Sequence, residues 1–146
     1  MPDQIHLTVA TLCHRDGLLL MVEEMDKGRL VINQPAGHVE IGESFKSAAL
    51  RETLEETGYI IELEYVLGIS VLRAANGITY YRVSFIASCP EQIPCPNLDP
   101  DIERAFWMKA EDVLDQANQR SEMVSRDVER FLSGTRYPLE MIDEKP

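Results

Sequence analysis

Short apolar runs and regular alternation of apolar and polar residues dominate the chain, and both patterns are typical of strands in a partly buried sheet. Two hairpin turn signals punctuate them, Arg15-Asp16-Gly17 and Asn76-Gly77. The pattern predicts strands or strand-rich segments at Ile5–Cys13, Leu18–Val22, Leu30–Ile32, Tyr59–Val71, Ile78–Ala87 and Ala105–Met108.

Three segments have helical character. Ser44 is a residue type that caps helix N-termini, and Gly58 readily adopts the left-handed conformation that ends a helix. We therefore expect a helix that begins after Ser44 and runs to about Thr57. Two further helices are expected at Ala110–Gln116 and Glu122–Leu132.

Loops are expected where turn-forming residues gather. These positions are Met25–Arg29, the turn Pro35-Ala36-Gly37, and Cys89–Pro100, which holds four of the eight prolines. Strands broken by helices in this order predict a mixed α/β architecture. With 146 residues the chain is long enough for a sizeable core, and we expect residues 1–146 to form a single domain.

The composition narrows the classes of partner. The net charge is −11, so the surface repels the phosphates of DNA and RNA, and nucleic acid polymers are excluded as stable partners. The same charge repels a phosphorylated substrate unless cations intervene. No apolar run approaches the roughly 18 residues of a membrane-spanning helix, and the N-terminus lacks the basic region of a signal peptide. We expect a cytoplasmic protein without a membrane partner.

The cysteines point to the same compartment. Cys13, Cys89 and Cys95 fit no zinc-binding spacing, and their odd number argues against a disulfide framework. We therefore expect reduced thiols, with Cys13 in the core because it lies in an apolar strand.

A cluster of carboxylates gives the first indication of chemistry. Glu52, Glu55 and Glu56 lie within five residues on the expected helix, where they share an arc of roughly 100° on one face. A Glu-rich helical run is usually a solvated face. Like charges at i, i+4 weaken a helix, however, and a divalent cation between them would remove that repulsion. Oxygen ligands of this kind favour Mg²⁺, Mn²⁺ or Ca²⁺ over zinc.

The surroundings of these acids decide between the two interpretations. The segment from Gly37 to Tyr59 fits the pattern G-x5-E-x7-R-E-U-x-E-E-x-G-U, in which U is an apolar residue. This pattern is the Nudix box, and the segment closely resembles that hydrolase family. One position departs from it: Thr53 stands where an aliphatic residue is usual, and we interpret it as a packing variant. The resemblance implies an α/β/α sandwich with a mixed β-sheet, in which the box is loop, helix and loop.

Weaker likeness extends over nearly the whole chain. The lead-in NQPAGH, the segment DPDIERAFWM and the late run SGTRYPLEMI resemble the NudJ-type phosphatase subgroup of the Nudix family. The resemblance implies a metal-dependent hydrolase that releases phosphate from nucleoside tri- and diphosphates and from thiamin-pathway diphosphates. Two alternatives stay open: a nucleotide-pool pyrophosphohydrolase that releases pyrophosphate, and a non-catalytic module that binds a nucleotide. Retention of all the box glutamates argues against the second.

The resemblance also assigns roles to residues. It implies that Mg²⁺, with Mn²⁺ as a substitute, is held by box carboxylates and by a backbone carbonyl at the turn before the helix. It implies a structural salt bridge between Glu43 and Arg51, although helix geometry alone points Arg51 away from the carboxylate arc. The metal ligands implied are Ala36 or Gly37, Glu52, Glu55 and Glu56. Candidates for the general base are Glu52, Glu56 and Asp101, with Glu103 as the near rival of Asp101.

Substrate contacts are expected outside the helix. Arg82 and Tyr80 lie on one face of an alternating strand, where an arginine can clamp a phosphate and a tyrosine can stack on a base. Gln34 and His38 flank the box turn and complete the expected substrate-binding set. The partner is thus a phosphorylated small molecule, and we favour a monomer over a dimer.

Overall fold

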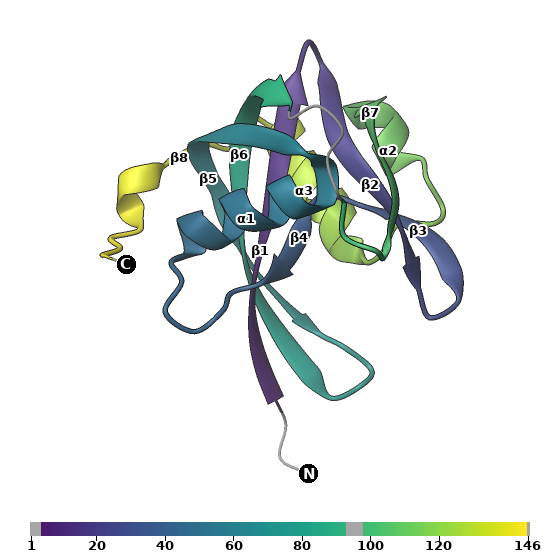
Figure 1. The fold of residues 1–146 in the computed structure, drawn as a ribbon, viewed down its shortest axis with the longest axis horizontal. Helices are drawn as coiled ribbons and strands as arrows, with labels where there is room; N and C mark the ends of the chain where they lie inside the picture. Colours follow the sequence, from purple (N-terminus) through teal and green to yellow (C-terminus); the bar gives the residue numbers. More distant parts are fainter. Residues whose placement is uncertain (1–3, 93–97, 146) are drawn as a thin grey trace.

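The computed structural model describes residues 4–92 and 98–145, which form one mixed β-sheet with helices on two sides (Figure 1). The strands are β1 Gln4–Arg15, β2 Leu18–Asp26, β3 Arg29–Asn33, β4 Ala36–His38, β5 Tyr59–Arg73, β6 Ile78–Gln92, β7 Ile102–Lys109 and β8 Tyr137–Pro138. The helices are α1 Phe45–Thr57, α2 Ala110–Leu114, α3 Glu122–Leu132 and the short 3₁₀ helix η1 Leu139–Met141.

The sheet has the order β3-β2-β1-β6-β5-β8 within the described residues, and β4 and β7 pair off this path with β1 and β2. β1 runs parallel to β6, and the other pairs are antiparallel. This mixed sheet confirms the expected α/β class. In the parallel pair, His6 lies opposite Tyr80 and Thr8 opposite Arg82. Because side chains alternate along a strand, these four residues share one face of the sheet.

Helices cover both faces of the sheet. On one face Ala48 and Ala49 of α1 pack against Val9, Val66 and Phe85 of the strands. On the other face a second buried cluster joins the strands to α2 and α3. Figure 1 shows α1 in front of the sheet and α3 behind it, which is the expected three-layer sandwich. No helix among the described residues is long and apolar enough to cross a membrane.

Local sequence fixes α1, as the capping residues predicted. The hydroxyl of Ser44 accepts a hydrogen bond from the Ser47 backbone N–H at 3.0 Å, which satisfies a free donor of the first turn. At the other end Gly58 has φ 76°, a conformation that costs glycine little, and its N–H donates to the Leu54 carbonyl.

Three expected loops are wrong in part. The turn Pro35-Ala36-Gly37 becomes strand β4 from Ala36 onward, because Ala36, Gly37 and His38 pair with β1. The loop Met25–Arg29 shrinks to the turn at Lys27 and Gly28, since β2 and β3 pair on both sides of it. The loop expected at Cys89–Pro100 begins later, because β6 continues to Gln92; residues 93–97 of that loop, with Cys95, lie outside the described residues. The helix expected to reach Gln116 ends at Leu114.

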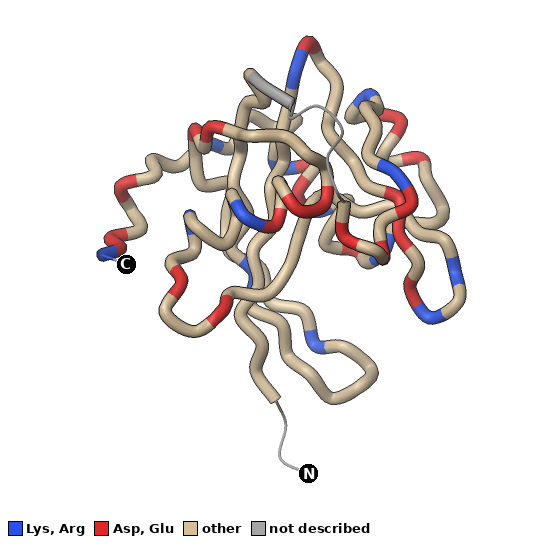
Figure 2. The backbone as a smooth tube through the Cα atoms, in the orientation of Figure 1, with Lys and Arg blue, Asp and Glu red and all other residues tan. Residues whose placement is uncertain are grey.

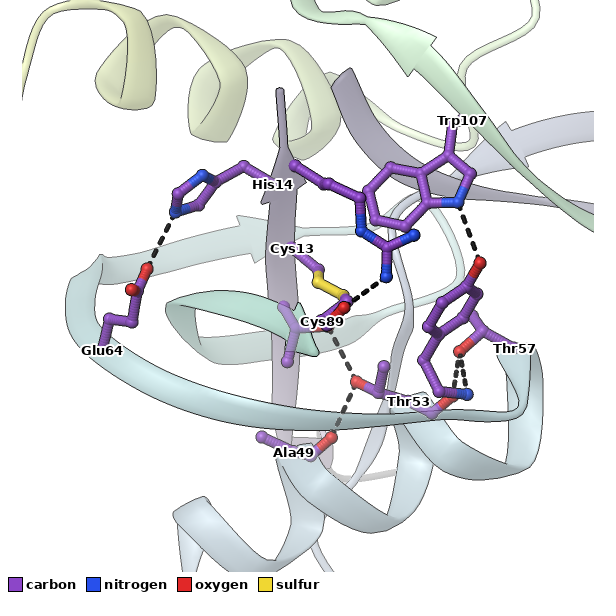
Figure 3. The surroundings of a disulfide bond; sticks show 11 residues. Cys13, His14, Ala49, Thr53, Thr57, Glu64, Cys89 and Trp107 are labelled. Atoms are coloured by element: carbon purple, nitrogen blue, oxygen red, sulfur yellow. Dashed lines mark hydrogen bonds and ion pairs between the residues drawn. A yellow bond between two sulfur atoms is a disulfide. The ribbon is translucent and has the colours of Figure 1, made fainter. Parts of the chain in front are cut away.

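The expectation of reduced thiols stays a prediction, but the structure brings two of the cysteines together. Cys13 of β1 lies beside Cys89 of β6, with the two Cα atoms 6.3 Å apart, and Figure 3 draws their sulfur atoms in contact. Both residues are buried, so Cys13 does lie in the core. The pairing arises because β1 and β6 are neighbours in the sheet, a contact between segments 76 residues apart that spacing alone does not reveal.

The one departure from the box pattern has a packing role. Thr53 is fully buried, and its hydroxyl lies 2.8 Å from that of Thr11 on β1 and donates to the Ala49 carbonyl (Figure 3). The hydroxyl is therefore satisfied inside the interface between α1 and the sheet, which is the condition for burying a polar group at little cost.

Candidate active site

A pocket of about 600 Å³ opens between the C-terminal half of α1 and the strands β2, β4 and β6. Figure 2 shows acidic residues on α1, on β2 and before β7. Two acids from each of these elements line the pocket: Glu52 and Glu56, Glu24 and Asp26, and Asp99 and Asp101. Cationic and aromatic side chains line it as well. The lining includes Glu24, Asp26, Asn33, Ala36, Gly37, His38, Glu52, Glu56, Tyr80, Arg82, Asp99, Asp101 and Arg120.

Glu52 and Glu56 project from successive turns of α1 into this pocket. Glu52 is partly buried, and its carboxylate lies so close to Gly37 that a Cβ at this position would overlap it. Glycine at position 37 thus lets the backbone of β4 approach the helix. Burial raises the pKa of Glu52, and the hydrogen bond from Arg51 opposes that shift.

Glu56 is the most deeply buried acid of the helix. It is 6% exposed, and its Oε1 accepts a hydrogen bond from the Ala36 backbone N–H at 2.9 Å. Burial, together with the nearby charges of Glu24, Glu52 and Asp99, raises the pKa of Glu56 to about 9 despite that hydrogen bond. No cationic side chain of the described part of the chain forms an ion pair with Glu56.

A hard divalent cation fits this arrangement. A buried carboxylate surrounded by other carboxylates, with no cation beside it, is the environment that a bound cation stabilises. Residues 4–92 and 98–145 contain no ready-made cluster of three His, Cys, Asp or Glu side chains. Arg51 hydrogen bonds to Glu52 and Glu55, so both of these carboxylates already have a cationic partner.

Arg51 organises the opposite side of α1. Its Nε donates to Glu43 Oε2 at 2.7 Å and its Nη2 donates to Oε1 at 2.9 Å, so the structure brings together the two residues of the implied salt bridge in a bidentate pair. Its Nη1 reaches Glu52 at 2.8 Å and Glu55 at 3.2 Å. The expectation that Arg51 points away from the carboxylates is therefore wrong, because its long side chain folds back across the helix surface.

Glu55 lies apart from the main pocket. Its side chain is 49% exposed and lines a smaller adjoining cavity with Asp99. Asp99 and Asp101 both line the main pocket, and the Asp101 backbone N–H donates to Asp99 Oδ1 at 3.1 Å. Asp101 thus faces the same space as Glu52, whereas its rival Glu103 is exposed and lies outside the pocket lining.

Strand β6 contributes a cationic and an aromatic side chain to the pocket lining, Arg82 and Tyr80. Arg82 is 7% exposed, and its Nε and Nη1 are buried without a hydrogen-bond partner. Tyr80 lies two residues before it on the same face, and its ring meets the His6 ring edge-on at 5.4 Å between centroids. His38 Nε2 lies 3.0 Å from His6 Nδ1. Burial lowers the pKa of His38, and His6 and Arg120 lower it further.

Gln34 does not reach the pocket. It is fully buried, and its Nε2 donates to Asp127 Oδ2 of α3 at 2.8 Å. The expectation of a direct substrate contact for Gln34 is therefore corrected to a supporting position behind the pocket wall. Sequence could not show this, because the partner is 93 residues away.

Sequence reasoning missed a charged pair on the pocket wall. Arg120 Nη1 donates to Glu24 Oε1 at 2.7 Å, its Nε lies 3.5 Å from Asp26 Oδ2, and Asn33 Nδ2 donates to Glu24 at 3.2 Å. Glu24 is buried although it lies on an exposed-looking Glu-Glu step. Alternation along β2 gave no signal for it, because Leu19, Leu20, Met21 and Val22 are all buried and so both faces of the strand are covered.

Comparison with known proteins agrees with this geometry. Residues 4–128 match the NUDIX domain family. The chain is 37% identical to the protein called Phosphatase NudJ from Escherichia coli strain K12 over 139 residues, which cover 95% of this chain and 91% of that protein. Phosphatase NudJ of Shigella flexneri matches equally well.

Solved structures give the same result. The structure resembles a NUDIX hydrolase from Nitrosomonas europaea with a TM-score of 0.93 and 37% identity, covering 97% of this chain and 98% of that one. A MutT NUDIX hydrolase from Burkholderia pseudomallei shares the fold, with a TM-score of 0.74 at 22% identity over 88% of this chain and 98% of that one.

Proposed function

Since this chain belongs to the NUDIX hydrolase family, we propose that it uses Mg²⁺ to cleave phosphoanhydride bonds and that it releases inorganic phosphate. The proposed substrates are nucleoside tri- and diphosphates and thiamin-pathway diphosphates. One observation carries the proposal: a single pocket is lined by the acids Glu52 and Glu56 and by Arg82, whose guanidinium makes no hydrogen bond among the described residues. The name of the relatives, Phosphatase NudJ, supports release of phosphate.

Glu52 and Glu56 would hold the cation, together with the backbone carbonyl of Ala36 or Gly37, which lie beside them in β4. Glu55 can join this set only after its carboxylate leaves Arg51. Bound Mg²⁺, or Mn²⁺ in its place, supplies positive charge to the phosphoryl oxygens and lowers the pKa of a coordinated water.

The general base must accept a proton from the attacking water. Glu52, Glu56 and Asp101 all face the pocket and remain the three candidates. Asp101 lies in the segment before β7, where the Asp99 backbone N–H donates to the Glu55 carbonyl of α1 at 2.9 Å. Its carboxylate thus enters the pocket from a different element than the two helix acids.

The same pocket suits the remainder of the substrate. Arg82 can donate to phosphate oxygens from Nη2, because its side chain lines the pocket and no hydrogen bond among the described residues occupies that nitrogen. Tyr80 lies two residues away on the same face of β6, roughly 7 Å along the strand. We propose that Tyr80 and His38 contact the ring of a base there.

Product analysis tests the proposal. A nucleoside triphosphate is mixed with excess enzyme and Mg²⁺ for a single turnover, and ion chromatography separates phosphate from pyrophosphate. We expect phosphate and the nucleoside diphosphate. Pyrophosphate and the monophosphate as dominant products would instead identify a nucleotide-pool pyrophosphohydrolase, and binding without any cleavage would identify a non-catalytic module.

A further inference from the structure

A buried polar cluster lies directly behind the pocket wall that Arg82 forms. Asp127 of α3 is fully buried, and its Oδ2 accepts hydrogen bonds from Gln34 Nε2 at 2.8 Å and from the Ser84 hydroxyl. The same Oδ2 lies 4.0 Å from Arg82 Nη1, too far for a hydrogen bond but close enough for strong attraction in a buried environment. Arg82 thus has a counter-charge on the side away from the pocket.

The geometry points to Asp127 as the residue that positions Arg82 for the phosphate of the substrate. This inference rests on the proposed phosphate contact of Arg82. Arg82 and Ser84 are two residues apart on β6 and share one face of the strand. The hydrogen bond from Ser84 therefore holds the Asp127 carboxylate next to the Arg82 guanidinium. Gln34 fixes it from the segment between β3 and β4. Asp127 is therefore oriented by the elements that also line the pocket.

The charges explain why a carboxylate stands at this position. A guanidinium that is 7% exposed has lost most of its hydration, and without a nearby anion its burial would cost several kcal/mol. Asp127 provides that anion on the Nη1 side of the guanidinium. The guanidinium is therefore held from that side, and Nη2, which is not one of the buried nitrogens, is left toward the pocket that Arg82 lines.

Arg130 is the other cation near Asp127, and it serves a different contact. Its Nη1 lies 4.0 Å from Asp127 Oδ1, but it donates at 3.1 Å to Ser70 on β5, and its side chain is 33% exposed. Because Arg130 has its own hydrogen bond and access to water, it depends less on Asp127 than Arg82 does. Loss of the Asp127 charge should therefore change the position of the Arg82 side chain more than that of Arg130.

A double-mutant cycle tests the inference. Isothermal titration calorimetry measures the binding of inorganic pyrophosphate to the full chain with Mg²⁺ present. The variants are Asp127→Asn, Arg82→Lys and the double substitution. Glu129→Gln is the matched control, because it makes the same chemical change at an exposed position on α3. We expect Asp127→Asn to weaken binding on the order of tenfold, within the range for coupled contacting charges. In the Arg82→Lys background, Asp127→Asn should weaken pyrophosphate binding by less than about twofold more. Glu129→Gln should leave binding unchanged.

The outcomes separate the inference from its premise. If Arg82→Lys leaves pyrophosphate binding unchanged, the proposed phosphate contact fails, and the positioning role fails with it. If Arg82→Lys weakens binding but Asp127→Asn only lowers Tm, Asp127 is a structural residue and the inference alone is overturned. Should Asp127→Asn fail to fold, Ser84→Ala takes its place, because it removes one hydrogen bond that orients Asp127. It should weaken binding about threefold, and unchanged binding would reject the role.

Discussion

The two flanks of helix α1 satisfy their charges in opposite ways. On the loop side, Glu43 and Arg51 form a bidentate ion pair with distances of 2.7 and 2.9 Å. On the pocket side, Glu56 is buried with no ion pair among the described residues, and Arg82, which lines the same pocket, has two buried nitrogens that make no hydrogen bond there. Both flanks belong to the same thirteen-residue helix and its immediate surroundings, so helix propensity does not account for the contrast.

This difference distinguishes charged groups that stabilise the fold from charged groups that are available to bind a ligand. A charge with a well-placed partner contributes to stability, whereas a buried charge without one is costly until a ligand of opposite sign arrives. Under the proposed function, a bound cation would neutralise the pocket acids. Arg82 has the Asp127 carboxylate as a counter-charge at 4.0 Å but no hydrogen bond to it, and it would donate hydrogen bonds to the phosphate. A metal-bound phosphate would supply both interactions in the pocket that these residues line.

Removal of divalent metal should have the largest effect. We expect EDTA to abolish hydrolysis and Mg²⁺ or Mn²⁺ to restore it, because the side chains at the reacting end of the pocket are carboxylates. Phosphate release measured before and after metal is added back checks this. Full turnover by metal-free protein would contradict the assignment of the pocket acids.

Glu52→Gln should lower kcat by at least about 10²-fold, because it removes a ligand charge or the base at constant volume. Circular dichroism should show an intact fold, since the amide can still accept a hydrogen bond from Arg51. Steady-state kinetics at saturating Mg²⁺ supplies the measurement. A rate near that of the wild type would make Glu52 a solvated residue of the helix surface.

Arg82→Lys should raise KM about tenfold with a smaller change in kcat. Lysine keeps the positive charge but lacks the planar fork that binds two phosphate oxygens at once. KM and kcat for a nucleoside diphosphate, determined side by side, separate the two effects. An unchanged KM would mean that the guanidinium compensates charge inside the fold and does not contact substrate.

Glu43→Gln should act on stability more than on rate. The substitution weakens a partly exposed ion pair and is expected to cost about 1 kcal/mol, or a fall in Tm of about 3 °C. The hydrogen bond from Arg51 lowers the pKa of Glu43, so its stabilising contribution is present above the ordinary carboxyl pKa and is lost as pH falls through the lowered value. Thermal denaturation at neutral and acidic pH measures both; an equal Tm difference at both pH values would contradict the pairing.

The parts of the fold that local sequence controls could be predicted. Helix α1 has its N-cap at Ser44 and its C-terminal glycine at Gly58, and the box pattern fixes where Glu52 and Glu56 fall on it. The hairpin at Asn76 and Gly77 follows from turn chemistry in the same way: the Gly77 backbone N–H donates to the Ala74 carbonyl at 3.1 Å.

The parts that depend on distant partners could not be predicted. Strand β4 has three residues and exists only because β1 pairs with it. Gln34 turns inward because Asp127 accepts its hydrogen bond from the far helix, and Glu24 is buried because Arg120 arrives from the loop before α3. Such contacts are set by packing of the whole chain, and their spacing in the sequence carries no regular signal.

Glu56→Gln tests the central claim most directly, because it should separate rate from stability. The account predicts that kcat falls by at least about 10²-fold, while the Tm of the metal-free protein stays equal or rises, since a neutral amide replaces a buried acid surrounded by negative charge and can still accept the hydrogen bond from Ala36. Kinetics and thermal denaturation of the same preparation in EDTA-treated and Mg²⁺-loaded form give both numbers. A near-normal kcat together with a Tm lower by several degrees would show that Glu56 holds the fold together, and would contradict its place in the active site.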